Sequence, residues 1–353
     1  MALRDDDGPE TRGGNPRRDT FRPNTADMKP LDIYCNAALP ADAEAKFAAG
    51  IEGHRWLRPS GGPVGVLGRA GPDPRIDEAD VVFGQPDPAQ VASSGRVAWV
   101  HLISAGYTAF DTPAIREDFR ARRAALTKSS LVFDEPCALH VLAFLCAEAR
   151  QLRDAFEDQR GARAWPQLAL RAKSRILRDE LVTIVGFGSI ARHLVQLLEP
   201  LGLRIQAIRR QVAGDEGVPT FALGSPEAAQ ALGRADHVID ILPASPGTEG
   251  FFDAARLESL KRGAVFYNIG RGTTVDQRAL AAALHSGQLA AAYLDVTDPE
   301  PLPVDHPLWS APSCTITPHI AGGHATEWVR LVHHFLDNLV RYTAGQPLLD
   351  RVW

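Results

Sequence analysis

Three polar residues each follow an apolar run that is typical of a buried strand. Arg271 comes after AVFYNIG, Glu300 after AAYLDVTDP and His319 after TITP. Because the carboxyl ends of parallel strands meet at one edge of a sheet, where open α/β sheets bind ligands, we expect these side chains to lie together. Each residue alone would usually be structural, but their shared position favours a common chemical role.

These side chains are the groups that reduction of a 2-keto acid needs. A guanidinium fork binds the substrate carboxylate and its adjacent carbonyl. Hydride delivery to the carbonyl carbon leaves an alkoxide, so a proton donor such as histidine must stand beside the oxygen. A carboxylate on the far ring nitrogen favours the imidazolium and orients the ring. The pattern predicts these roles for Arg271, His319 and Glu300, in that order.

The stretch VTIVGFGSIARHLVQLL, residues 182–198, is typical of a dinucleotide-binding turn. Gly186 allows the tight turn, Gly188 lets a pyrophosphate approach the backbone, and Ala191 is small enough for the helix to pack on its strand. The amides that open the helix would hold the pyrophosphate. The alternative is an ordinary strand, turn and helix with no ligand. The expected cofactor contacts in this turn are Gly186, Phe187, Gly188, Ser189 and Ile190.

Arg209 and Arg210 end the next apolar run, about twenty residues on, where an Asp or Glu would bind the 2′-hydroxyl of NAD. The usual acid, which would repel a 2′-phosphate, is missing, and the two guanidiniums can bind one through charge-assisted hydrogen bonds. We therefore expect NADP(H) as the preferred cofactor, with NAD(H) as the second choice. Arginine is common in this chain, so the alternative is two surface arginines on an enzyme that uses NAD.

The composition is that of a globular chain. Its 353 residues are 45 % hydrophobic and 23 % charged, which suffices for two domains with sizeable cores. A net charge of -5 gives no general attraction to nucleic acid or anionic membrane. We identify no apolar run of the roughly 18 residues that a membrane span needs. The four cysteines are scattered with no CxxC pair, so we expect reduced thiols, no metal site and a cytoplasmic protein.

Short apolar runs alternate with helical patterns from residue 31 onward, as in parallel β/α units. Strands are expected at 31–35, 64–68, 81–84, 97–103, 181–185, 204–208, 220–223, 237–242, 264–269, 291–296 and 314–318. The segment 135–152 is apolar nearly all round, so its helix should be buried, and we place it in a homodimer interface. Residues 326–345 predict a long amphipathic helix.

The run from 241 to 323 resembles the nucleotide domain of D-isomer-specific 2-hydroxyacid dehydrogenases. NIGRG at 268–272, LDVTDPEPL at 294–302 and TPHIAGG at 317–323 match three signature blocks of that family in order and spacing. Within the family, the chain is similar to NADPH-dependent glyoxylate/hydroxypyruvate reductases. The similarity extends more weakly over roughly residues 30–353.

The resemblance implies that Arg271 binds the substrate, that Glu300 supports the histidine, and that His319 is the acid/base. It also implies that Asp295 meets the nicotinamide carboxamide. Further cofactor contacts are expected at Leu242, Pro243, Ile269, Gly270 and Gly322.

The segment SAGYTAFD, 104–111, resembles the family loop whose amides hold the substrate carboxylate, which points to Ala105 and Gly106. The family usually has an Asp near Thr108, so the detailed shape of this loop is left open. Neither this loop nor the segment 83–88 supplies a second cation, so small uncharged substituents are favoured. The expected reaction is hydride transfer from NADPH to glyoxylate or hydroxypyruvate, giving the D-2-hydroxy acid.

The fold class is α/β, with two Rossmann-like doubly wound parallel-sheet domains and the active site in the cleft between them. Residues 30–133, completed by 322–353, are expected to form the substrate-binding domain, and 134–321 the dinucleotide-binding domain. Residues 1–29 are polar, lack the apolar core of a signal peptide, and are expected to be a disordered extension.

Two other functions fit parts of this pattern. A formate dehydrogenase shares the fold but carries Gln where this chain has Glu300, so the sequence argues against it. A dinucleotide-sensing binding protein, like the corepressors built on this fold, can retain all three catalytic residues. Only turnover with a keto acid separates that alternative from an enzyme.

Overall fold

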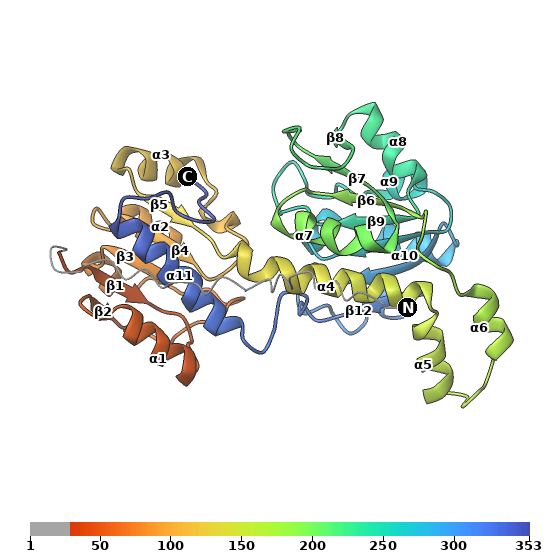
Figure 1. Ribbon diagram of the computed structural model, residues 1–353, viewed down its shortest axis with the longest axis horizontal. Coiled ribbons are helices and arrows are strands. Elements are labelled where there is room, and N and C mark those ends of the chain that lie inside the picture. Colours follow the sequence, from red (N-terminus) through yellow and green to blue (C-terminus); the bar gives the residue numbers. More distant parts are fainter. Residues whose placement is uncertain (1–28) are drawn as a thin grey trace, which may run out of the picture.

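The computed structural model describes residues 29–353 and contains two parallel β-sheets (Figure 1). One sheet has five strands in the order β2-β1-β3-β4-β5, and the other has seven in the order β12-β11-β10-β9-β6-β7-β8. The predicted fold class of two doubly wound parallel sheets is confirmed. The predicted N-terminal extension lies outside the described residues, apart from Lys29.

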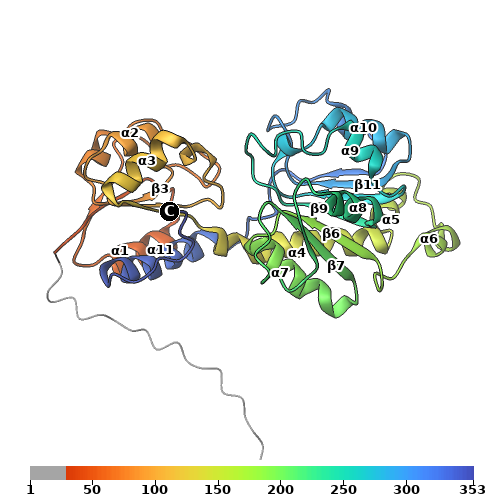
Figure 2. The same ribbon diagram turned by 90° about the horizontal axis from the view of Figure 1, so that it is seen from above.

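The first unit is the five-stranded sheet with its helices. Its strands are β1 (Asp32–Cys35), β2 (Arg55–Leu57), β3 (Val81–Gly84), β4 (Trp99–Leu102) and β5 (Ala125–Thr127). Its helices are α1 (Ala41–Gly50), α2 (Pro88–Ser93), α3 (Pro113–Arg122), the C-terminal α11 (Glu327–Thr343), and the 3₁₀ turns η2 (Pro74–Glu78) and η3 (Thr108–Phe110). Figure 2 shows α1 and α11 on one face of the sheet and α2 and α3 on the other, so both faces are covered.

The strand predicted at 64–68 is wrong. Only Val64 makes a β-bridge, and its partner Ala37 lies just beyond the end of β1 and outside the sheet's strands. The amide of Gly68 then donates to the carbonyl of Gly65 at 2.9 Å, which turns the chain away from the sheet. The strand beside β1 is instead β2, which the sequence pattern missed because it is only three residues long and begins with a charged residue.

The second unit is the seven-stranded sheet with its helices. Its strands are β6 (Leu181–Val185), β7 (Arg204–Arg209), β8 (Thr220–Ala222), β9 (His237–Asp240), β10 (Ala264–Asn268), β11 (Leu289–Leu294) and β12 (Cys314–Ile316). Its helices are α7 (Ser189–Leu198), α8 (Pro226–Arg234), α9 (Ala254–Ser259), α10 (Gln277–His285), and the 3₁₀ turns η4 (Glu199–Leu201), η5 (Gly272–Thr274) and η6 (Pro307–Trp309). The strand order reverses direction at β6, and such a switch point opens a crevice at the carboxyl ends of the strands.

Helix α4 (Ser130–Ala149) joins the two units (Figure 1). By length and composition this helix could cross a membrane, so the expectation that no apolar run was long enough is wrong. Only part of its surface is buried within one chain: it packs on α7 and its buried Glu148 accepts a 2.7 Å hydrogen bond from the hydroxyl of Tyr293, whereas Leu131 and Leu139 are exposed. Beyond α4, α5 (Leu152–Arg160) and α6 (Gln167–Lys173) form an arm that extends away from both sheets.

Helix α11 returns the end of the chain to the core of the first unit. The fully buried ring of Phe335 stacks on Phe83, with ring centroids 4.5 Å apart, and on Trp99, at 5.3 Å. Residues after the helix pair with β5, where the amide of Val352 donates to the carbonyl of Leu126 at 2.8 Å. The C-terminal segment therefore belongs physically to the first unit.

Phe335→Ala should lower the free energy of unfolding of the first unit by about 3–5 kcal/mol, because it leaves a cavity among stacked rings. Asp337→Ala, at an exposed position on the same helix, is the control and should change it by less than about 0.5 kcal/mol. Urea unfolding followed by tryptophan fluorescence measures both. Equal effects of the two substitutions would show that α11 does not contribute to this core.

Candidate active site

The three predicted catalytic residues follow β10, β11 and β12, which are neighbours in the second sheet. Nδ1 of His319 lies 2.8 Å from Oε2 of Glu300. The other oxygen of Glu300 accepts the amide of Thr297 at 3.1 Å, which fixes the carboxylate. The structure therefore brings together the histidine and the acid that the sequence paired, and within residues 29–353 Nε2 of the ring has no hydrogen-bond partner.

Asp295 holds the turn that carries the histidine. Its side chain is only 2 % exposed, and its oxygens accept the hydroxyl of Thr317 at 2.6 Å and the amides of Ile320 and Ala321 at 2.9 and 2.8 Å. His319 itself has a φ of +54°, a conformation that non-glycine residues seldom adopt. Asp295 was expected to meet the cofactor. In the structure its carboxylate holds this strained turn through hydrogen bonds.

Arg271 lies at the junction of the two units. Burial lowers the pKa of its guanidinium, and the nearby Glu300 carboxylate opposes that shift. Its Nη1 donates to the carbonyl of Gly270 at 2.6 Å, and its Nη2 packs directly against the space where a side chain at Gly106 would stand. The loop that holds Ala105 and Gly106, from the first sheet, thus meets the arginine from the second.

This junction borders a cleft of about 430 Å³. Arg271 and Gly106, both expected from the sequence, line it together with Tyr107, which was not predicted. The expected Ala105 is not a lining residue and packs against the core. Arg69 also lines it and was missed, because it directly follows the run 64–68, which was wrongly predicted as a strand. Within residues 29–353, Arg69 has no carboxylate within 4 Å, so the cleft contains a second cation with no acidic partner in that part of the chain.

The glycine turn forms a backbone cradle at the end of β6. Gly186 has a φ of +96°, and a Cβ there would lie 2.7 Å from the carbonyl oxygen of Ile241. A Cβ at Gly270 would lie 2.6 Å from the carbonyl oxygen of Leu242, so both walls are bare backbone. Nothing lies within 4 Å of a Cβ built on Gly188, directly before α7. This open, amide-lined space fits the dinucleotide that the sequence predicted.

The remaining predicted cofactor residues surround this cradle unequally. Ser189 opens α7, Ile269 follows β10, and Pro243 follows Leu242 in the loop after β9. Phe187 and Ile190 pack into or against the core beneath the turn. Gly322 lies against α4, where a Cβ would meet the ring of Phe133 at 3.0 Å.

The two arginines at the end of β7 have different partners. Nη1 of Arg209 lies 2.8 Å from Oε1 of Glu216, whose side chain is 2 % exposed. Hydrogen bonds from the amide of Ala213 and from Arg209 lower the pKa of Glu216 to about 2. Arg210 is exposed and has no acidic partner within 4 Å in the described part of the chain. The sequence prediction missed Glu216, which follows the strand by seven residues and folds back onto it.

Comparison with known proteins agrees with this geometry. The family model described as "D-isomer specific 2-hydroxyacid dehydrogenase, NAD binding domain" matches residues 142–321. A human glyoxylate reductase/hydroxypyruvate reductase is 34 % identical over 224 residues, which are 62 % of this chain and just under two thirds, 66 %, of that protein. The mouse protein of the same name is 31 % identical over 338 residues, 91 % of this chain and 98 % of its own length.

The structure is also similar to the crystal structure of a D-isomer specific 2-hydroxyacid dehydrogenase from Xanthobacter autotrophicus, solved in complex with NADPH and MES. The TM-score is 0.74 at 25 % sequence identity, over 92 % of this chain and 98 % of that one. The two sheets, the paired histidine and acid, and the matched family model lead to one conclusion: the chain belongs to the D-isomer specific 2-hydroxyacid dehydrogenase family and is an enzyme.

Proposed function

We propose that the chain reduces a small 2-keto acid, of the glyoxylate or hydroxypyruvate kind, with NADPH and releases the D-2-hydroxy acid. The observation that carries the proposal is the pair of His319 and Glu300, 2.8 Å apart, near a half-buried Arg271 that contacts the loop of Gly106. The human and mouse relatives are named for both substrates, and the Xanthobacter enzyme was solved with NADPH.

In the proposed mechanism, Arg271 and the amides of Ala105 and Gly106 hold the substrate carboxylate and orient its carbonyl. Nε2 of His319 donates a proton to the carbonyl oxygen as charge develops there. Glu300 stabilises the protonated ring that must precede that transfer. When bound, the nicotinamide supplies the hydride. The cradle between Gly186 and Gly270 would hold the dinucleotide, and the free guanidinium of Arg210 supports a 2′-phosphate.

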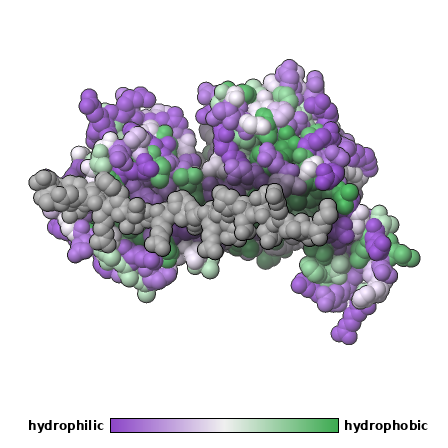
Figure 3. Space-filling model, in the orientation of Figure 1, coloured by the Kyte–Doolittle hydropathy of each residue, from purple (hydrophilic) through white to green (hydrophobic). Residues whose placement is uncertain are grey.

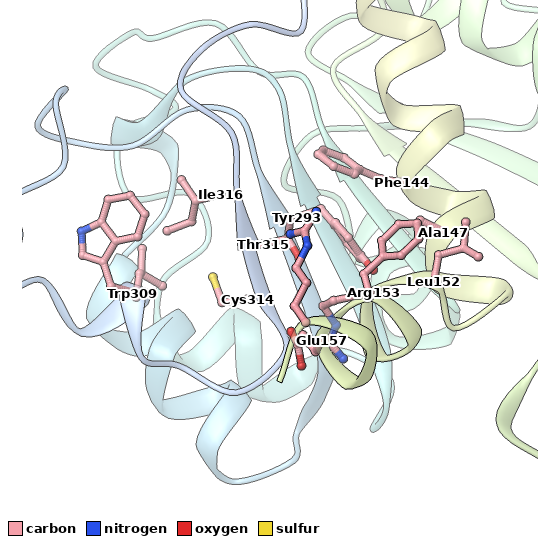
Figure 4. A pocket seen from close by; sticks show the side chains of 13 residues that line it. Phe144, Ala147, Leu152, Arg153, Glu157, Tyr293, Trp309, Cys314, Thr315 and Ile316 are labelled. Carbon is pink, nitrogen blue, oxygen red and sulfur yellow. The ribbon is translucent and has the colours of Figure 1, made fainter. Parts of the chain in front are cut away.

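We also propose a cytoplasmic homodimer. The arm of α5 and α6 has no buried residue, yet it carries Trp165, which is 89 % exposed, and Leu168, which is 80 % exposed. Figure 3 shows apolar residues on this arm. A groove lies at its base between α4, α5 and β12, lined by apolar side chains such as Phe144 and Ile316 (Figure 4). A second copy would cover the arm, the groove and the exposed Leu139 of α4.

The alternative is a dinucleotide-sensing binding protein on the same fold. Steady consumption of NADPH with a keto acid separates the two. The assay should include glyoxylate, hydroxypyruvate, pyruvate and oxaloacetate, each with NADPH and NADH, because Arg69 adds a cation that could bind a second carboxylate.

Glyoxylate should be reduced and acetaldehyde left untouched, because acetaldehyde has no carboxylate for Arg271 to bind. Initial rates of NADPH oxidation at matched substrate concentrations measure the difference. Comparable turnover of the two aldehydes would show that Arg271 does not bind a carboxylate. Absence of turnover with every keto acid would favour the binding protein.

His319→Ala should lower kcat by about 10²–10⁴-fold, because it removes a positioned proton donor. Glu300→Gln keeps a hydrogen-bond acceptor but loses the negative charge that favours the protonated ring, so the reduction rate should fall at lower pH than in the wild type. His333→Ala, at an exposed position on α11, is the control and should leave the pH profile in place. An unchanged profile in Glu300→Gln would separate Glu300 from proton transfer.

Light scattering of the full chain at micromolar concentration should give the mass of a dimer. The double substitution Trp165→Asp and Leu168→Asp should shift it toward the monomer, because carboxylates on the arm would have to be buried at the interface. Val212→Asp, at an exposed apolar position distant in the chain, is the control. A wild-type monomer would overturn the dimer.

A further inference from the structure

We infer that Glu216 competes with the cofactor: its carboxylate occupies the anion-binding position that the 2′-phosphate of NADPH needs, and so limits the preference that Arg209 and Arg210 would otherwise create. The inference rests on the proposed function, since it assumes that the crevice beside the glycine turn binds a nicotinamide dinucleotide. It concerns only which dinucleotide binds better.

Three donors converge on this one carboxylate. Arg209 donates to Oε1 at 2.8 Å, the amide of Ala213 donates to the same oxygen at 2.7 Å, and the amide of Gly214 donates to Oε2 at 2.8 Å. A guanidinium and two backbone amides aimed at one point are the donor set that typically binds a phosphate. In this chain an internal carboxylate fills the site they form.

The position of this site matches the adenosine ribose end of the crevice. Arg209 is the last residue of β7, the strand next to β6, and the amide of Gly186 donates to the carbonyl of Ile208 at 2.8 Å. The end of this second strand is where such folds contact the ribose 2′ substituent. Glu216 thus lies where such folds recognise the 2′ substituent of the ribose, although in sequence it stands seven residues after the end of the strand.

The charges around the site cancel except at one residue. Arg209 is paired with Glu216, and Arg192 is paired with Asp215 at 3.2 Å, which leaves Arg210 as the unpaired cation in this part of the described chain. Because the pKa of Glu216 is lowered to about 2, the carboxylate stays ionised at physiological pH and protonation cannot remove the competition.

The Arg209–Glu216 pair therefore affects the binding of the two cofactors differently. NADH carries a neutral 2′-hydroxyl and can bind with the Arg209–Glu216 pair intact. The 2′-phosphate of NADPH must either displace Glu216 from its three donors or bind through Arg210 beside a fixed negative charge. Either route weakens NADPH binding relative to what two free arginines would give.

The test is Glu216→Gln in the full chain, with dissociation constants for NADPH and NADH measured by calorimetry and cofactor fluorescence. The ratio of the NADH constant to the NADPH constant should rise about tenfold, as expected when one charge-assisted competitor is removed. Asp215→Asn is the matched control. Asp215 is the residue before Glu216 and carries the same charge, but its side chain is 70 % exposed. Its replacement should therefore change the ratio by less than about twofold.

Two further variants make the inference falsifiable even if Glu216→Gln folds poorly. Arg210→Gln should weaken NADPH binding more than Arg209→Gln does, because Arg209 is already engaged. In the Arg209→Gln background, the effect of Glu216→Gln on the ratio should become smaller, because the guanidinium that Glu216→Gln would release for the phosphate is absent. A ratio that falls in Glu216→Gln would mean that Glu216 positions Arg209 for the phosphate, and an unchanged ratio would place the phosphate elsewhere. Either result overturns the inference.

Failure of the proposed function looks different. An enzyme that reduces glyoxylate with an unchanged cofactor ratio in Glu216→Gln contradicts only the inference. A chain that binds both dinucleotides, shows the predicted change in ratio and reduces no keto acid contradicts only the proposed function.

Discussion

The buried carboxylate of Asp295 holds the turn that carries His319 against the sheet. Its side-chain oxygens accept hydrogen bonds from the hydroxyl of Thr317 and from two backbone amides beyond His319. The backbone carbonyl of Asp295 accepts the amide of His319 at 2.9 Å. A buried carboxylate must be fully hydrogen-bonded to be tolerated, and here the groups that satisfy it belong to the turn it organises. The positive φ of His319 persists because this network holds the residues on both sides of it. Everything proposed for proton transfer depends on that turn, since a displaced ring would lose its 2.8 Å contact with Glu300.

The proposed substrate site also depends on contact between the two sheets at their polar edges. Arg271 comes from the seven-stranded sheet and Gly106 from a loop of the five-stranded one, and the guanidinium packs where a side chain at Gly106 would stand. The hydroxyl of Thr108 reaches the carbonyl of Ala244 across the same junction at 3.4 Å. Helix α4 links the units and packs against both α7 and α11, so the junction and the glycine turn are connected through one helix. A substrate bound at this junction, as proposed above, would contact both units.

Charge is distributed differently at the two ends of the crevice. At the proposed substrate end, Arg271 and Arg69 line one cleft with Asp87, whose carboxylate accepts the amide of Gln90 at 2.8 Å, so the two cations outnumber the acid among the lining residues. At the end of β7, where the adenosine is proposed to bind, Arg209 pairs with Glu216 and Arg192 with Asp215, and within residues 29–353 Arg210 has no acidic partner within 4 Å. An acid that faces an arginine neutralises its charge and also orders its side chain. Cofactor preference in this chain is thus a balance between neighbouring groups, which counting arginines at the strand end does not capture.

The amino-acid sequence by itself determined the fold class, the glycine turn, and the convergence of Arg271, Glu300 and His319. These features follow from local patterns, because apolar runs of strand length and glycines at fixed offsets act within a few residues, and parallel strands bring their carboxyl ends to one edge. Only the tertiary structure decided the path of residues 64–70, the partner of Arg209 and the hydrogen bonds by which Asp295 holds the turn of His319. Each of these depends on contacts between segments whose meeting leaves no local pattern. The glycines of the 64–68 run turn it away from the sheet to line the cleft, and Glu216 reaches Arg209 only because the loop between them folds back.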